Sequence, residues 1–228
     1  MEPNPLAALN GILTDGLVFC TQAYAIFEQL RSAQDGASRL RLRTSQVEKR
    51  LVEEVLPICR YIQTYYRPGR YISVRWVDGG QTFDAELQQS GWYVDQGCYP
   101  KLMHLEITLA MHENEHVIWQ HLSEGKGAFA PEGVIRNKRE PAYSLPHVFR
   151  QDEHVALFVP IVVSQIAKKA EKPYPQGTSL VVQCHLNSLY TPAEWDVLVD
   201  NVKLQMPTNN FKEILMVNEV IDRASVLR

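Results

Sequence analysis

The chain has 228 residues, of which 45% are hydrophobic and 21% are charged. It contains no apolar run long enough to cross a bilayer, so a membrane role is excluded, and a net charge of −3 with a pI near 6.2 gives no general attraction to nucleic acid. The acidic start of the chain lacks a secretory signal, and the four cysteines form no C-x-x-C pair. We therefore expect an ordinary globular, cytoplasmic protein with one sizeable core.

Helical patterns fill the first part of the chain. Apolar residues between positions 6 and 30 recur at mostly helical spacing. Ser45 and Glu48 form a capping box, which predicts a second helix that runs to about residue 65. Pro57 should kink or split this helix, because proline cannot donate the internal hydrogen bond.

Three strand patterns follow. The segment YISVRWV (71–77) alternates, Asp78-Gly79-Gly80 predicts a hairpin turn, and TFDAEL (82–87) is the second strand of the hairpin. From Met103 to Met111, apolar and polar residues alternate without a break, which predicts a third strand and not a helix. A helix of about residues 114–122 comes next, with Asn114 able to cap it.

The second half continues with helices and strands. Residues 125–150 are rich in turn residues and predict an irregular excursion, with a hairpin that carries the basic group RNKR. The remaining predicted elements are a helix from Asp152 through Ile166 that Pro160 bends, a strand at 179–186, a capped helix at 191–204 and a strand at 211–217. We expect an α/β fold with a mixed central sheet flanked by helices.

This element order also predicts the domain organisation. Residues 1–42 are expected to form an N-terminal helical extension, and residues 43–228 a single α/β core domain that contains the excursion at 125–150.

Two carboxylates fall on adjacent predicted strands. Asp84 and Glu86 share one face of the hairpin, and Glu106 and Thr108 share the polar face of the third strand. Such a pair suits Mg²⁺, which prefers hard oxygen ligands and can polarise a phosphodiester and activate the attacking water. The alternative is that these side chains form the solvated or hydrogen-bonded face of a sheet.

This arrangement resembles the core of the restriction-endonuclease-like, or PD-(D/E)XK, superfamily, in which a hairpin and a third strand present an aspartate and then E-x-K. The resemblance covers roughly residues 45–190. Asp84 stands for the aspartate and Glu106 for the acidic residue, while Thr108 occupies the place of the lysine. The resemblance implies a Mg²⁺-dependent nuclease or a nucleic-acid-binding protein that acts on DNA or RNA, with Asp84, Glu86 and Glu106 at the metal. Because threonine cannot supply positive charge, either another residue supplies it or hydrolysis is weak or absent.

Two other functions are compatible with the sequence. Without the lysine, the chain would be a non-catalytic interaction module on the same fold, with a protein partner or a second copy of itself. His112, Glu113 and His116 also have the H-E-x-x-H order of zinc peptidases, in which two histidines one turn apart bind Zn²⁺ and the glutamate activates water. That site needs one continuous helix, and a strand that reaches Met111 leaves His112 outside it.

Any contact with nucleic acid needs a local basic patch, because the net charge is acidic. The sequence offers two such groups. One is in the excursion and consists of Arg136, Lys138 and Arg139. The other begins with Arg39, Arg41, Arg43, Lys49 and Arg50. The alternative is that both are solvated basic faces, balanced by neighbouring glutamates.

Overall fold

The computed structural model describes residues 4–137, 140–186, 188–218 and 223–228. In this part of the chain, one mixed sheet has the order β1-β2-β3-β4-β7-β8-β9, and β5 and β6 form a separate hairpin. The strand bounds are β1 (Thr14–Asp15), β2 (Tyr71–Trp76), β3 (Ala85–Ser90), β4 (Leu102–Ala110), β5 (Val134–Asn137), β6 (Glu140–Ser144), β7 (Ser179–Cys184), β8 (Ile214–Asn218) and β9 (Ala224–Val226). The predicted α/β class with a mixed sheet is confirmed.

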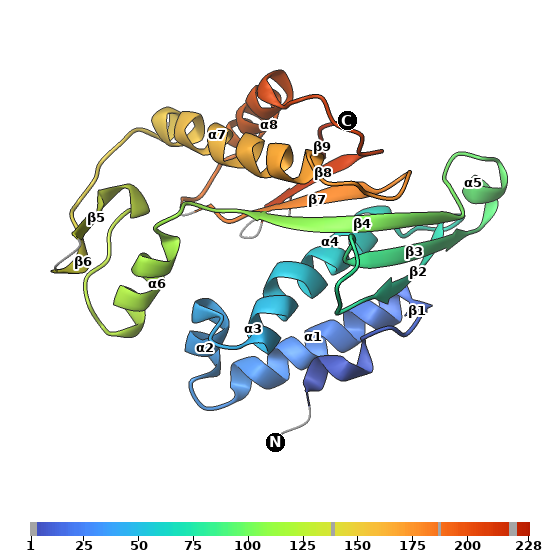
Figure 1. The fold of residues 1–228 in the computed structure, drawn as a ribbon, viewed down its shortest axis with the longest axis horizontal. Helices are drawn as coiled ribbons and strands as arrows, with labels where there is room; N and C mark the ends of the chain where they lie inside the picture. The colour runs from blue at the N-terminus through green and yellow to red at the C-terminus, as the bar shows by residue number, and fades with distance from the viewer. Residues whose placement is uncertain (1–3, 138–139, 187, 219–222) are drawn as a thin grey trace.

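Helices cover both faces of this sheet. Helices α1 and α4 lie on one face, and α7 and α8 lie on the other (Figure 1). The helix bounds are α1 (Gly16–Ser32), α2 (Gly36–Leu42), α3 (Gln46–Arg50), α4 (Leu56–Tyr65), α5 (Trp92–Asp95), α6 (Glu115–Ser123), α7 (Gln151–Ala170) and α8 (Pro192–Gln205), with short 3₁₀ turns at Pro5–Ala8 and Pro131–Gly133. None of the described helices is both long and apolar enough to span a bilayer.

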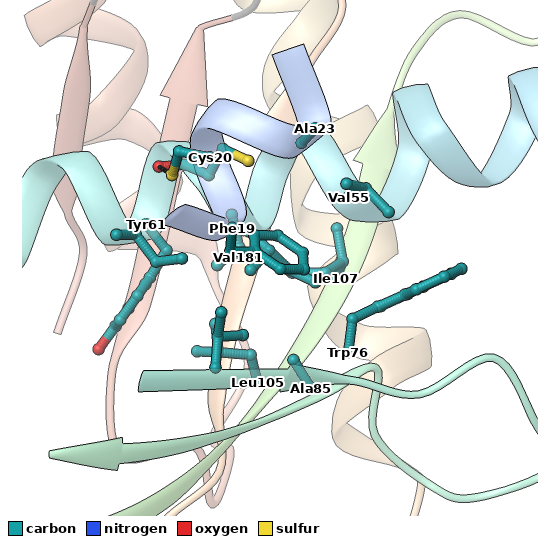
Figure 2. Packing of buried hydrophobic residues seen from close by; sticks show 14 of the residues in the cluster. Phe19, Cys20, Ala23, Val55, Tyr61, Trp76, Ala85, Leu105, Ile107 and Val181 are labelled. Atoms are coloured by element: carbon teal, nitrogen blue, oxygen red, sulfur yellow. Dashed lines mark hydrogen bonds between the residues drawn. The ribbon is translucent and has the colours of Figure 1, made fainter. Parts of the chain in front are cut away.

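Each face of the sheet has its own hydrophobic core. Leu105 and Ile107 of β4 pack with Phe19 of α1 and Val55 before α4 (Figure 2). Ala110 of the same strand joins the apolar side chains of α7 and α8 on the opposite face. The alternation of β4 that predicted a strand is therefore the alternation between two cores, and it leaves Glu106 and Thr108 on the face of α7.

The described part of residues 1–42 is built into the sheet and its core. Strand β1 pairs with β2, and Phe19 and Ala23 of α1 are fully buried in the same cluster as Leu105. Figure 1 shows α1 lying along α4 beneath the strands. This segment is helical, as predicted, and it supplies part of the main core.

The predicted helix of residues 45–65 has a π-helical turn in its middle. Helices α3 and α4 are joined by Leu51–Val55, and the amide of Leu56 donates to the Leu51 carbonyl five residues earlier. Pro57 lies in the first turn of α4, directly after this π-turn. The proline that the sequence marked as a kink thus follows a local widening of the helix, because it cannot donate to an α-helical ladder.

The strand pairing leaves one edge of β4 open. Strands β2, β3 and β4 are antiparallel, and α7 then returns the chain so that β7 runs parallel to β4. The pairing of β4 with β3 stops at Leu105, whereas its pairing with β7 continues to Ala110. Beyond Leu105, the backbone of β4 therefore has a sheet neighbour on one side only.

Candidate functional site

The two predicted carboxylates meet where β3 begins. Asp84 directly precedes Ala85, which pairs with Leu105, the neighbour of Glu106 on β4. The Asp84 amide donates to the Leu105 carbonyl at 2.9 Å, and the Ile107 amide donates to Asp84 Oδ2 at 2.7 Å. The side chain of Asp84 thus reaches the backbone of the residue after Glu106, close enough for the Glu106 carboxylate to act on its ionisation.

Burial and mutual repulsion change the ionisation of this pair. Burial and the Glu106 carboxylate together raise the pKa of Asp84 to about 7, and the Ile107 amide and Lys169 lower it only in part. Glu106 itself is 6% exposed. Burial, and after it the charge of Glu106, therefore favour the protonated form of Asp84, and a bound cation would oppose both effects.

A lysine from α7 completes the group. Lys169 Nζ forms a short ion pair and hydrogen bond with Glu106 Oε1, across the interface between α7 and β4. The Tyr174 hydroxyl also lies near Glu106. Its burial and the charge of that carboxylate raise its pKa. Two carboxyl groups and one ammonium group are thus brought together from three elements that are distant in the sequence.

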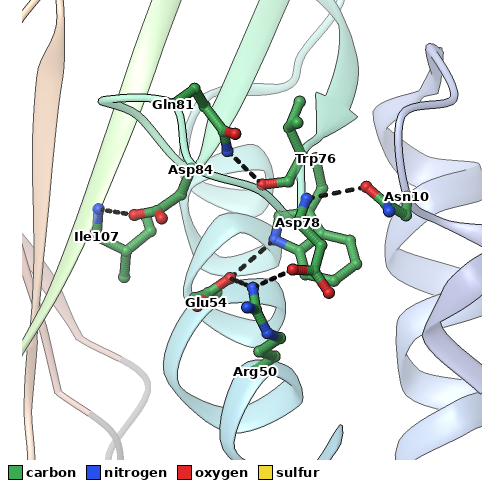
Figure 3. A network of polar contacts seen from close by, with 9 residues as sticks. Asn10, Arg50, Glu54, Trp76, Asp78, Gln81, Asp84 and Ile107 are labelled. Carbon is green, nitrogen blue, oxygen red and sulfur yellow. Dashed lines mark hydrogen bonds and ion pairs between the residues drawn. The ribbon is translucent and has the colours of Figure 1, made fainter. Parts of the chain in front are cut away.

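The π-turn adds a third carboxylate near this pair. Glu54 Oε2 accepts a hydrogen bond from the Trp76 indole at 3.1 Å and pairs with Arg50 at 3.7 Å (Figure 3). Arg50 also pairs with Asp78 at 2.5 Å. Burial raises the pKa of Glu54, while the Trp76 indole and Arg50 oppose that rise, and the negative charge of Glu54 contributes to the raised pKa of Asp84.

These groups border an open hollow of about 680 Å³, named here the carboxylate hollow. It lies at the open edge of β4, and Asp84, Thr108 and Lys169 are in its wall. Glu106 is buried and is not a wall residue itself, but its carboxylate is paired with Lys169, which is one. Opposite them, the wall carries Arg43, Lys49, Glu53 and Glu54 from the segment that leads into α4.

No family model, curated protein or solved structure matches this chain.

The donor set fits a hard divalent cation. Among the described residues, no three His, Cys, Asp or Glu side chains form a metal-binding group. Mg²⁺ needs only one or two carboxylates, because it keeps several waters. Asp84 and Glu106 supply two carboxylates that repel each other, and the open edge of β4 offers main-chain oxygens beside them.

The other two predicted site residues are Thr108, which borders the carboxylate hollow, and Glu86, which does not. Thr108 is buried in the wall of the carboxylate hollow, on the same face of β4 as Glu106. Glu86 lies two residues further along the hairpin, opposite His104, and forms an ion pair with Arg75 at 2.6 Å. Its carboxylate is engaged by Arg75 and not by Lys169, and it is absent from the wall of the hollow.

The H-E-x-x-H motif lies across the junction between β4 and α6. His112 precedes the helix and its Nδ1 accepts the Asn114 amide, whereas His116 is inside α6. Glu113 also lies before the helix. As the alternation of β4 predicted, the two histidines do not share one helical face, although both border the carboxylate hollow. Burial and the positive charge of Arg43 lower the pKa of His116.

The basic group of the excursion is only partly described. Arg136 is exposed on β5 and donates to the Glu113 carbonyl at 3.3 Å. Lys138 and Arg139 lie outside the described residues. The predicted hairpin of this segment is confirmed as β5 and β6.

The sequence held a signal for Lys169 and Glu54. Lys169 follows Val162 and Ile166 at helical spacing, so a lysine falls on the apolar face of α7. Glu54 likewise falls between Leu51 and Ile58 on the buried face of its helix. A charged residue on a stripe that must be buried indicates a partner in the interior, because an unpaired buried charge is too costly.

Proposed function

We propose that this chain is a Mg²⁺-dependent nuclease with a restriction-endonuclease-like core. The observation that carries the proposal is the ion pair of Lys169 with Glu106, whose charge also acts on the neighbouring Asp84. The resemblance implies two carboxylates and one lysine, but Thr108 occupies the position of that lysine. In this chain, α7 supplies an ammonium group to the same carboxylate.

The order of elements also supports the proposal. Helix α4, the hairpin β2–β3, strand β4, helix α7 and the parallel strand β7 follow one another in the order that the resemblance implies. Asp84 and Glu106 are the ligands available to the cation, which when bound would polarise the scissile phosphate and make its water ligand more acidic.

Each protein group then has a role. Asp84 must lose its proton before it can hold a cation, so binding should strengthen as the pH rises through about 7. Lys169 neutralises Glu106 in the cation-free protein. Released from that pair, its ammonium group would orient the attacking water and stabilise negative charge on the phosphate. Lys49, exposed at the opposite wall, suits a neighbouring phosphate.

Cleavage of labelled oligonucleotides tests the proposal. Purified wild type, Asp84→Asn and Lys169→Met would be incubated with single- and double-stranded DNA and RNA, with Mg²⁺ or with EDTA. We expect Mg²⁺-dependent cleavage by the wild type and a loss of at least about 100-fold in both variants, the size typical of a lost catalytic group.

Lys168→Met is the matched control for this experiment. Lys168 is exposed on the same turn of α7 and its replacement should leave cleavage unchanged. If wild type shows no Mg²⁺-dependent cleavage of any substrate, or if Asp84→Asn cleaves as fast as wild type, the proposal is wrong.

A further inference from the structure

A second and larger hollow lies beside the carboxylate hollow. It has a volume of about 980 Å³, at the upper end of the range for ligand pockets, and it is named here the aromatic hollow. Its walls come from α2, from α6 and from the loops that flank the hairpin β5–β6. Figure 1 shows α2 and α6 on the same side of the molecule. The aromatic and imidazole side chains in its wall include Phe27, Trp119, Phe129, His147 and Phe149.

Arg43 borders both hollows. Its side chain is only 5% exposed, with Nε at 3.1 Å from Glu53 and the guanidinium 4.3 Å from the centre of the Trp119 ring. Its backbone is left-handed, with φ of 51°. The contacts with Glu53 and Trp119 hold the guanidinium at the junction of the two hollows.

The wall of the aromatic hollow exposes apolar side chains to water. Phe129 is 49% exposed and Val148 is 94% exposed, and Phe149 beside them is partly buried. Exposed apolar groups gathered at a concave surface are typical of a binding site. Phe129 and Phe149 in this wall offer ring faces on which flat ligand groups can stack.

A line of cations runs from one hollow to the other. Lys49 borders the carboxylate hollow, Arg43 lies at the junction and Arg41 borders the aromatic hollow. Lys49 and Arg41 are exposed, and within the described residues no carboxylate forms an ion pair with either. The glutamates that were expected to balance this basic segment are paired with other members of it, since Glu48 pairs with Arg39 and Glu53 with Arg43.

We propose that the aromatic hollow binds unpaired bases of a single-stranded nucleic acid, whose phosphates follow Arg41, Arg43 and Lys49 into the carboxylate hollow. This inference rests on the proposed nuclease function and names its substrate class. A cationic track beside stacking side chains is the general arrangement for single strands. A continuous duplex keeps its bases stacked inside, where Phe129 and Phe149 cannot reach them. An apolar peptide would leave the cationic track without a partner.

Binding without cleavage tests this inference. The probe is fluorescein-labelled oligothymidylate, and its anisotropy would be measured with EDTA and in the Asp84→Asn background. We expect Phe129→Ala and Arg41→Ala each to weaken binding about tenfold, because the first removes a ring on which a base stacks and the second removes a phosphate contact. A closed dumbbell duplex of the same length should bind more weakly to wild type and be unaffected by Phe129→Ala.

The controls match each variant. Trp92→Ala removes an aromatic side chain that is 62% exposed on α5, at the far end of the molecule (Figure 1), and Lys203→Ala removes an exposed cation from α8. Both should bind the probe as wild type does, and thermal unfolding would establish that all variants are folded.

The outcomes separate this inference from the nuclease proposal. If Phe129→Ala and Arg41→Ala bind the probe as tightly as wild type, or if the duplex binds equally well, the inference is wrong even if Mg²⁺-dependent cleavage is observed. If single-strand binding depends on both residues but no cleavage occurs, the inference stands and the nuclease proposal fails.

Discussion

Asp84 and Glu106 were predictable as a pair, and Lys169 was not assigned. Strand parity places the two acids on facing positions, because side chains on adjacent strands with a known register must meet. No local rule links a helix residue to a strand residue 63 positions away. The lysine on the apolar stripe of α7 indicates a buried partner, but only the packing of α7 on β4 identifies that partner as Glu106.

The raised pKa of Asp84 predicts a stability that depends on pH. The folded protein binds this proton with a pKa of about 7, against 3.8 for an ordinary aspartate. The group therefore favours folding below about pH 4, and its contribution is lost as the pH rises through 7, by up to about 4 kcal/mol. We expect Asp84→Asn to be more stable than wild type at pH 8, and the two to approach each other at pH 5.

Urea unfolding at several pH values measures this effect. Asp200→Asn, at an exposed position on α8, is the control and should keep the pH dependence of wild type. A parallel pH dependence for wild type and Asp84→Asn would mean that Asp84 titrates normally in the folded protein.

At the scale of elements, prediction succeeded where a segment carries a long periodic pattern. The strands β2, β4, β7 and β8, and the helices α6, α7 and α8, lie near their predicted positions, whereas β3 begins three residues later than predicted and leaves Asp84 just before it. The sequence pattern missed β1, β9, α2 and α5. These elements are two to seven residues long, too short for a period, and strand pairing and packing with the rest of the fold determine them.

Thr108 on β4 and Lys169 on α7 border the same hollow. A lysine at either position would therefore place an ammonium group there. We expect Lys169→Met to abolish cleavage and Thr108→Lys in that background to restore part of it, about tenfold or more. Thr108→Lys alone should lower stability, because it adds a second buried cation beside Lys169. Single-turnover cleavage and thermal unfolding of the four proteins provide the measurement.

The same substitution at a neighbouring position is the control for this exchange. Leu109 is the next residue of β4 and also borders the hollow. Its side chain points to the opposite face of the sheet, so Leu109→Lys is the control. It should give no rescue in the Lys169→Met background. Equal rescue by both lysines would mean that a positive charge anywhere near the hollow is sufficient.

The whole molecule depends on residues before position 43 more than the helical pattern indicates. An amphipathic stripe predicts that one face of a helix is buried, but not which surface covers it. Here the stripe of α1 covers the sheet, since Phe19 and Ala23 are fully buried beside strand residues.

Removal of residues 1–42 should therefore prevent folding of the remainder. Without α1, the apolar faces of α4 and β2 would be exposed to water. We expect fragment 43–228 to lack a cooperative thermal transition and to bind the dye ANS, as measured by circular dichroism and fluorescence. A fragment that unfolds cooperatively at the wild-type temperature would establish residues 1–42 as a dispensable extension.

The π-turn at Leu51–Val55 determines how α3 is rotated about the helix axis relative to α4. A π-turn adds one residue to a helical ladder, and one residue in an α-helix corresponds to a rotation of about 100°. Deleting a residue there would restore a regular α-helix and rotate α3 about its axis relative to α4. The apolar face of α4 would still lie on the sheet, while Lys49, and Arg43 just before α3, would swing away from the carboxylates. The phase of this one helix thus sets the direction of the cationic wall independently of the packing of the core.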